Sequence, residues 1–551
     1  MVISNGILDF KRLKNLADWK LLLFLILFLD VKLVVKVAAI ILIYILQSNF
    51  KFGFRFKNSR LPLFYLLAIG IAIINWLIGQ NYGNINYDLV LLTGVSFWLL
   101  CILGLHQVKL SVEKNDVETI NRTIIIFFAL NALLSFINLA VIIYHTGHLN
   151  PYTYQGEYQK YFISTGDYIR GIAFDTSITN AVLNAFGVIY FLSKKNSVML
   201  LVCMAVMLLT GSNFIDLVLL IILVVWFVVK SIRDQKGLIA VCLMFLLVFM
   251  ARISPQNLIY LHETIKNNLF PLPVDYSAAA QAKPLPYITL RPDSTLTPDE
   301  KKEKTARAFL DSIYIVQHPN PAPHHEYPII TDAGRIITPG TNINLRPYQH
   351  VADTTAYQKK LLAFINVHKA SLPLSDGKDS KPHKTGKALC IAQTLGFLKQ
   401  HPVKILTGDG MGNFSSKLAF KATGLGIEGG YPQKYTYINP DFLSNHLDIY
   451  LDFFSKNSDN HSLTNNPGSV YEELLAEYGL LGLAAFLVCY LWYFLKHYKR
   501  LTYGLPVLVM LIAIFFIDYW FEQLSVILFF ELLLLLNIKE RSPETIPAHA
   551  N

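Results

Sequence analysis

The stretch from Asn121 to Tyr144 reads NRTIIIFFALNALLSFINLAVIIY and decides the fold. After Arg122 it holds no charged residue. A helix of roughly 20 apolar residues is long enough to cross the hydrocarbon core of a bilayer, so this segment predicts a membrane-spanning helix. Similar apolar runs recur along the chain, separated by short basic stretches and by one long polar block.

The composition leads to the same class of protein. The chain has 551 residues, of which 53% are hydrophobic and only 16% are charged. Because soluble domains carry about 25% charged residues, a string of soluble domains is excluded, as are disordered, collagen-like and disulfide-rich chains. The net charge is +10, but no basic face of a folded domain is visible, so we expect no nucleic-acid partner.

Basic residues in short loops predict the membrane topology, because such loops stay in the cytoplasm. The stretch 19–47 contains Asp30 and Lys32, and it fits one long helix or a hairpin of two short ones. All basic short loops fall on one side only if this stretch crosses twice. We therefore expect about twelve helices with both termini in the cytoplasm. The ten other predicted spans are 62–79, 88–107, 121–144, 176–193, 196–211, 214–230, 238–251, 471–495, 503–519 and 522–537.

This topology predicts an all-α integral membrane protein in three parts. Helices one to nine occupy 1–252, a large block outside the membrane occupies 253–469, and helices ten to twelve with a cytoplasmic tail occupy 470–551. No removable signal peptide is visible, so the first hairpin would act as a retained signal anchor. Apolar spacing and capping patterns predict that the outer block is mostly helical, with helices near 297–315, 356–369, 385–400 and 441–455.

Cysteine and histidine in the outer block do not predict a metal site. Cys390 is the lone cysteine of the block, and the other four lie in apolar runs, so an internal disulfide is excluded there. The block is rich in histidine, but no His/Cys/Glu set has the spacing of a zinc site. We expect no metal and no cofactor.

A glycine-rich motif, Gly408-Asp-Gly-Met-Gly-Asn-Phe414, follows a short apolar stretch in the outer block. Glycines allow backbone N–H groups to approach an anion closely. Gly408, Gly410, Gly412 and Asn413 are therefore candidates for substrate binding. The alternative is a tight turn between two structural elements.

Two arginines are expected at the outer surface. Arg170 precedes Gly171 just before the sixth helix, and Arg252 ends the ninth. A guanidinium group suits bidentate binding of phosphate oxygens. The alternative is that each arginine anchors its helix at the membrane interface.

The start of the tenth helix combines a capping pattern with a buried acid. Ser469 and Glu472 have the spacing of a capping box, and Glu477 follows about two turns inside the helix. A carboxylate at that depth is costly and is usually paired or functional, so a structural and a catalytic role both stay open. For Asp216 and Glu531, two further acids within apolar runs, we expect structural roles.

The segment from Asn465 to Gly482, NNPGSVYEELLAEYGLLG, resembles the signature that follows the large periplasmic loop of O-antigen ligases and O-antigen polymerases. Arg170-Gly171 and the Gly408–Phe414 motif are similar in style to that family. The layout of twelve helices, with a large loop between the ninth and tenth, is similar as well. The resemblance is close over roughly 385–497 and covers most of the membrane region, whereas nothing carries over to 253–384.

The resemblance implies a metal-independent glycosyltransferase of the C-type membrane fold in the bacterial inner membrane. Its donor would be a glycan on undecaprenyl pyrophosphate, used at the periplasmic face. Arg170 and Arg252 would bind the pyrophosphate, and His461 would be the loop histidine that accepts the hydroxyl proton. His446 competes for that role, because Gly468 stands where family members often have histidine. Glu477 would hold the histidine or an arginine in place.

The acceptor separates the alternatives within this family. A ligase transfers the glycan to lipid A-core, which we favour because of the large loop, whereas a polymerase transfers it to another lipid-linked glycan. Transfer to a protein is a third option. A polysaccharide transporter or flippase, or a non-catalytic scaffold, are the rival classes. Transporters usually show repeats and two equal halves, and the predicted nine-plus-three division has neither.

Overall fold

We describe the protein from a computed structural model. The described residues are 16–30, 32–52, 61–79, 83–153, 166–174, 176–229, 231–254, 292, 329–330, 336–337, 386–425, 429–453 and 463–541. His461 and the predicted helices at 297–315 and 356–369 lie outside these ranges.

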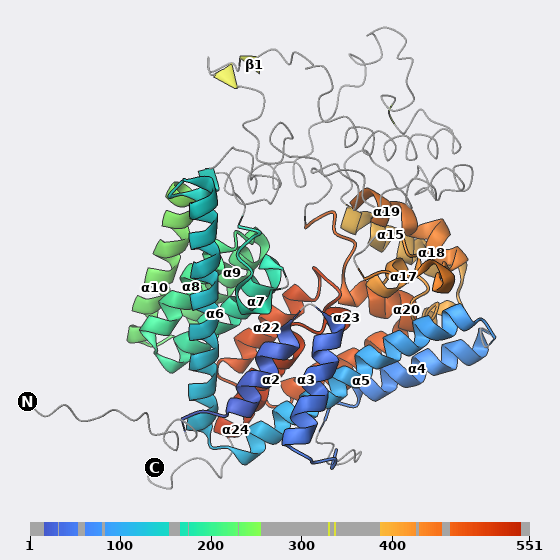
Figure 1. Cartoon of the computed structure of the whole chain (residues 1–551), viewed down its shortest axis with the longest axis horizontal. Helices are drawn as coiled ribbons and strands as arrows, with labels where there is room; N and C mark the ends of the chain where they lie inside the picture. The colour runs from blue at the N-terminus through green and yellow to red at the C-terminus, as the bar shows by residue number, and fades with distance from the viewer. Residues whose placement is uncertain are drawn as a thin grey trace, which may run out of the picture.

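The first part of the chain is a series of apolar helices, and each predicted span there is a helix (Figure 1). The stretch 19–47 forms two helices that pack side by side, since the first ends at Asp30. Lys36 Nζ donates to the carbonyl oxygen of Phe28 across this hairpin (2.5 Å). The hairpin alternative is therefore correct. The helices are α2 (Trp19–Leu29), α3 (Leu33–Leu46), α4 (Phe64–Ile78), α5 (Ile85–Lys114), α6 (Val117–Thr146), α7 (Ser177–Lys194), α8 (Ser197–Leu209), α9 (Asn213–Val229) and α10 (Arg233–Val248).

The described part of the outer block is also mostly helical. The helix expected at 385–400 is α15, but the one expected at 441–455 is split at His446, whose backbone leaves the helical conformation. The helices of the block are α15 (Gly386–Gln400), α16 (Lys404–Thr407), α17 (Lys417–Ala422), α18 (Pro440–Asn445) and α19 (Leu447–Phe453). Two antiparallel strands of two residues each, β1 (Ile329–Ile330) and β2 (Ile336–Ile337), complete its described part.

The last part contains the remaining predicted spans. A continuous helical segment runs from Val470 to Leu495 through a π-helical turn. Its elements, and those that follow, are α20 (Val470–Ala485), η11 (Phe486–Leu491), α21 (Trp492–Leu495), α22 (Gly504–Ile514), α23 (Trp520–Gln523) and α24 (Ile527–Glu540).

Four helical segments of the described residues are long and apolar enough to cross a membrane: Ile85–Lys114, Val117–Thr146, Arg233–Ile253 and Val470–Leu495. Six further apolar helices are shorter. The four long segments have the length and composition expected of membrane-spanning helices, and the shorter helices are apolar as well. The count of twelve crossings stays a prediction.

Several ends of the described helices meet on one face. The backbone N–H of Asp18 donates to Thr123 Oγ1 (2.9 Å), which joins the start of α2 to α6. Lys539 Nζ donates to the carbonyl oxygen of Val112 (2.6 Å), and Lys194 pairs with Glu540 (2.6 Å). The first and last described helices therefore have these ends on the same face as the basic α5–α6 turn. The assignment of that face to the cytoplasm stays a prediction.

The helices of the outer block gather at the other end of α4 and α5 (Figure 1). Asn86, at the start of α5, donates through Nδ2 to the carbonyl oxygen of Thr436 (2.9 Å). Asn75, near the end of α4, donates to the carbonyl oxygen of Thr407 (2.5 Å). This end of the bundle therefore positions the glycine-rich motif.

Glu531, for which we expected a structural role, forms hydrogen bonds with side chains of two other elements. Its Oε1 accepts hydrogen bonds from Tyr65 (2.5 Å) and Tyr490 (2.8 Å), both fully buried hydroxyl donors. Buried polar groups are stable only when they are paired in this way. The three side chains join α4, η11 and α24 in the core.

Candidate functional site

The glycine-rich motif lies against a kink in α20. At the kink, Gly479 has φ +65° and ψ −164°, a conformation open essentially to glycine alone. The kink removes the helical partners of two carbonyl groups. The loop supplies replacements, because Asp409 N–H donates to Ala476 (2.8 Å) and Gly410 N–H donates to Glu477 (3.0 Å). The loop and the kink therefore complete each other's hydrogen bonds.

The two backbones approach so closely that each contributes a glycine. A Cβ at Gly479 would lie 2.4 Å from the carbonyl oxygen of Leu406. A Cβ at Gly408 would lie 2.3 Å from the carbonyl carbon of Glu477. Neither distance is possible without moving backbone. Gly408 and Gly479 are thus fixed by packing.

Glu477 supplies the anion that the loop holds. Its Oε2 accepts from the N–H of Gly412 (2.6 Å), and its Oε1 accepts from those of Phe414 (3.2 Å) and Ser415 (3.1 Å). The residue is 1% exposed. The motif does cradle a carboxylate with backbone donors, but the carboxylate belongs to the protein itself. This geometry favours the tight-turn alternative, and it assigns Glu477 a partner that we did not expect.

The side-chain amide of Asn413 stabilises the same loop by hydrogen bonds. Its Nδ2 donates to the carbonyl oxygen of Asp409 (2.8 Å) and to Tyr87 Oη (3.2 Å), while its Oδ1 accepts from Tyr437 (3.1 Å). Burial raises the pKa of Tyr437, which suits a neutral hydroxyl donor. The amide of Asn413 is therefore fully used within the protein.

Three charged side chains meet at the edge of the loop. Lys404 Nζ pairs with Asp409 and, at 2.7 Å, with Asp441. Burial raises the pKa of Asp409 to about 8, although the Lys404 ammonium acts in the opposite direction. Burial lowers the pKa of Lys404, but its two carboxylate partners outweigh this and the net shift is upward. Lys404 is thus neutralised locally and is not a free cation.

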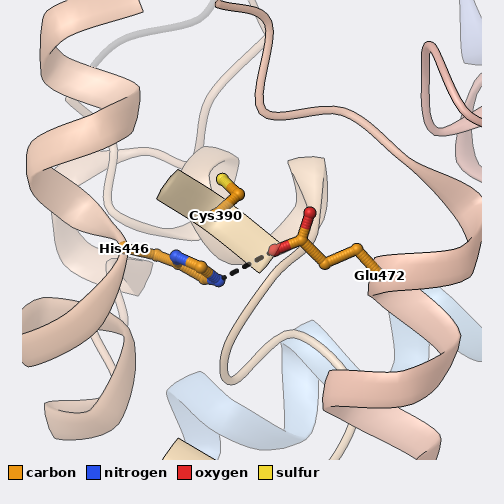
Figure 2. Close-up of side chains that lie close together, drawn as sticks. All are labelled: Cys390, His446 and Glu472. Atoms are coloured by element: carbon orange, nitrogen blue, oxygen red, sulfur yellow. Dashed lines mark ion pairs between the residues drawn. The ribbon is translucent and has the colours of Figure 1, made fainter. Parts of the chain in front are cut away.

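A second group of side chains, Cys390, His446 and Glu472, lies next to the loop (Figure 2). His446 is fully buried between α18 and α19, with Nε2 3.5 Å from Glu472 Oε1. The Sγ of Cys390 and one ligand atom from each of the other two lie within 4.8 Å of one another. We call these three residues the Cys390 cluster. The spacing of these residues in the sequence does not predict the cluster, because its members come from segments far apart in the chain.

The capping pattern of Ser469 and Glu472 correctly predicted the start of the helix that carries Glu472. Ser469 Oγ accepts from the N–H of Glu472 (3.5 Å), as an N-cap should. The carboxylate of Glu472 does not return to the cap. It accepts a hydrogen bond from Thr394 Oγ1 (2.9 Å) on α15 instead. The spacing thus predicted the helix start but not the target of the acid.

Burial also shifts the pKa of Cys390 in this cluster and the pKa of Lys387, which lies near it. It raises the pKa of the Cys390 thiol, and the charge of Glu472 adds to the rise. Burial lowers the pKa of Lys387, against the opposing effect of Glu472. Lys387 Nζ donates to the carbonyl oxygen of Gly468, the position where the resembling family often has histidine.

Arg170 projects from a rigid turn. The N–H groups of Arg170 and Gly171 donate to Asn138 Oδ1 (3.2 and 3.0 Å). Asn131 accepts from the N–H of Ile172 (3.0 Å), and a Cβ at Gly171 would lie 2.3 Å from this amide oxygen. The side chain of Arg170 is exposed. The buried Asn131 and the half-buried Asn138 therefore hold the backbone and leave the guanidinium accessible.

Arg252 lies in η5 (Phe249–Ile253), the π-helical turn that ends α10, and it is exposed as well. Single π-helical turns are frequent at functional sites. Asn150 Nδ2 donates to the carbonyl oxygen of Ile253 (2.9 Å) and ties this turn to the chain that follows α6.

Both arginine turns connect to the end of α8, and the Arg252 turn does so through Tyr152. The ring of Tyr152 lies 5.3 Å from that of Phe249, and its hydroxyl donates to the carbonyl oxygen of Leu209 (2.5 Å). Ile169, next to Arg170, forms a small buried cluster with Ile142, and the same Leu209 packs against this cluster. Among the residues that the structure describes, neither guanidinium forms an ion pair with a carboxylate.

The predicted site residues thus form two groups. Gly408, Gly410, Gly412 and Asn413 lie with Glu477, and the ring of Phe414 joins them to His446 at 4.6 Å. Arg170 and Arg252 form the other group, around α8. His461 falls outside the described residues. A comparison with family models, with curated proteins and with solved structures finds no match.

Replacing Gly479 tests the kink. Gly479→Ala should lower the free energy of unfolding by about 2 kcal/mol or more, because the methyl group strains the backbone and collides with Leu406. Gly396→Ala is the matched control, since no atom lies within 4 Å of its Cβ and alanine favours a helix by about 1 kcal/mol. Thermal unfolding in detergent should move in opposite directions for the two variants. A shift of the thermal midpoint of the same size and sign in both variants would contradict the close packing of the loop against the kink.

Replacing Glu477 tests the carboxylate clamp. Glu477→Gln keeps the shape but turns an NH₂ group toward backbone donors, so the free energy of unfolding should fall by about 2–4 kcal/mol. Glu118→Gln is the control, because that carboxylate is exposed and pairs only with Arg122, and its effect should stay within about 0.5 kcal/mol. Equal thermal midpoints for wild type and Glu477→Gln would show that the clamp is dispensable.

Proposed function

We propose that this chain is a membrane glycosyltransferase of the O-antigen ligase type. It would move a glycan from undecaprenyl pyrophosphate to an acceptor hydroxyl, with lipid A-core as the favoured acceptor. The observation that carries the proposal is the pair of arginine turns. Two exposed guanidinium groups, neither of which pairs with a carboxylate of the described residues, lie in turns that both connect to Leu209 at the end of α8.

This arrangement suits a lipid pyrophosphate. The apolar helices provide surfaces for a lipid tail, and the arginines are fixed at one end of those helices. A guanidinium group forms bidentate, charge-assisted hydrogen bonds with phosphate oxygens. Rigid support also reduces the entropy lost when a ligand orders the side chain. The resemblance of Asn465–Gly482 to the ligase and polymerase signature points to the same donor.

The reaction itself is a single displacement. The acceptor hydroxyl attacks the anomeric carbon, a new C–O bond forms, and the bond from that carbon to the pyrophosphate oxygen breaks. The hydroxyl proton passes to a base, and the electron pair leaves with undecaprenyl pyrophosphate. Negative charge grows on the leaving group, so fixed Arg170 and Arg252 would stabilise the transition state more than the ground state.

His461 would accept the hydroxyl proton, since an imidazole titrates near neutral pH. Complete burial of His446 supports this choice over the alternative histidine. Glu477 would act at a distance as a positioning residue, because its carboxylate holds the loop from Gly412 to Ser415. The site would face the periplasm, with the chain in the bacterial inner membrane and both termini in the cytoplasm.

Variants of the two arginines test this proposal. Arg170→Ala and Arg252→Ala should each lower glycan transfer by about 100-fold or more, as expected when a group that stabilises the transition state is removed. Arg122→Ala is the matched control, because Arg122 is exposed but pairs with Glu118 on the face of the basic α5–α6 turn. The measurement follows labelled glycan from undecaprenyl pyrophosphate to lipid A-core with purified protein in detergent.

Three outcomes of this assay separate the possible activities. Label on lipid A-core supports the ligase, whereas label on longer lipid-linked chains replaces it with a polymerase. Near-normal transfer by Arg170→Ala or Arg252→Ala would remove that residue from the pyrophosphate site. If neither acceptor receives label and the labelled glycan stays attached to undecaprenyl pyrophosphate, the transferase proposal fails.

A further inference from the structure

We propose that Cys390, His446 and Glu472 bind a zinc ion. The three side chains bring one sulfur, one imidazole nitrogen and one carboxylate oxygen within 4.8 Å of one another, and all three residues are buried. This proposal replaces the expectation from sequence that the outer block binds no metal. It is independent of the proposed glycan transfer.

The hydrogen bonds around the cluster leave room for a cation. Thr394 has a single hydroxyl proton, but it faces two acceptors, Glu472 Oε1 at 2.9 Å and His446 Nε2 at 3.2 Å. The second carboxylate oxygen of Glu472 has no hydrogen-bond partner among the described residues, although the residue is 96% buried. A buried carboxylate left in this state is costly. A cation bound by this carboxylate and by His446 Nε2 would offset that cost through its charge.

The tautomer of His446 fits metal binding. Its Nδ1 lies 2.9 Å from Gln393 Oε1, and in the tautomer with the proton on Nδ1 this nitrogen donates to the amide oxygen. Nε2 then presents a lone pair toward Glu472, 3.5 Å away, where a carboxylate alone would repel it (Figure 2). Metal-binding histidines almost always donate their other N–H to such a neighbour, which fixes the ring. Gln393 has that position here.

The ligand types and distances point to zinc. Sulfur, imidazole and carboxylate ligands together are typical of Zn²⁺, whereas Mg²⁺ and Ca²⁺ take oxygen ligands. Zinc bonds of roughly 2.0–2.3 Å keep tetrahedral ligand atoms about 3.3–3.8 Å apart. The His446–Glu472 distance of 3.5 Å is already in this range, and the Cys390 Sγ lies within 4.8 Å of the other two ligand atoms. A fourth position is left for water.

The position of the cluster gives the ion a structural role. Cys390 comes from α15, His446 from the junction of α18 and α19, and Glu472 from the first turn of α20. One ion would join two separate parts of the outer block to the helix that carries the kink. Binding of the ion would stabilise the folded state by the free energy of metal binding, because the unfolded chain does not hold the three ligands together.

Metal content and cobalt spectroscopy test the proposal on the full-length protein in detergent. Zinc added to metal-free protein should remain at one ion per chain after gel filtration, and it should raise the thermal midpoint. Cobalt(II) in its place should give a thiolate-to-cobalt charge-transfer band. Neither readout uses a glycan donor, so this proposal and the transferase proposal can fail separately.

Two cysteine variants show which thiol is the ligand. Cys390→Ser should abolish the cobalt band and weaken zinc binding by about tenfold or more. Cys489→Ser is the control, since Cys489 is a free, half-buried thiol in η11, and it should keep the band. If Cys390→Ser fails to fold, the zinc stoichiometry and the cobalt band of the wild-type protein still test whether the site binds a metal. Wild type without stoichiometric zinc, or a band that survives Cys390→Ser, would overturn the site and leave an imidazolium–carboxylate pair.

Discussion

A carboxylate buried among helices needs donors, and Glu477 takes three of them from the backbone of a single loop. This clamp determines much of the surrounding structure. It holds the glycine-rich loop against α20, and the kink at Gly479 then exchanges backbone hydrogen bonds with the same loop. Each part is stable only with the other, because separated N–H and carbonyl groups would be buried without partners.

The clamp also sets the position of the neighbouring cluster. Phe414, whose N–H binds Glu477, packs its ring 4.3 Å from Phe397 and 4.6 Å from His446. The loop is therefore one wall of the pocket that buries His446. A change at Glu477 should reach the Cys390 cluster through this ring, whereas the arginine turns around α8 rest on a different set of contacts.

Apolar length and charge were enough to find the helices. The break at Asp30 in the first hairpin followed from counting basic loops, and the structure has two helices there. The site was only partly predictable. Exposed arginines before α7 and after α10 were visible in the chain, but their common support at Leu209 was not. The split of the 441–455 helix was missed, because the burial of His446 depends on α15 and α20.

By itself, the sequence determined the membrane class, the helices and the glycines of the loop, since hydrophobic length and backbone freedom are local properties. It also indicated that Glu477 would be either paired or functional. Only the tertiary structure decided the partners: the loop N–H groups for Glu477, and Cys390 with His446 for Glu472. Those pairings join residues distant in the chain, and a buried charge selects whichever donor the packing brings within reach.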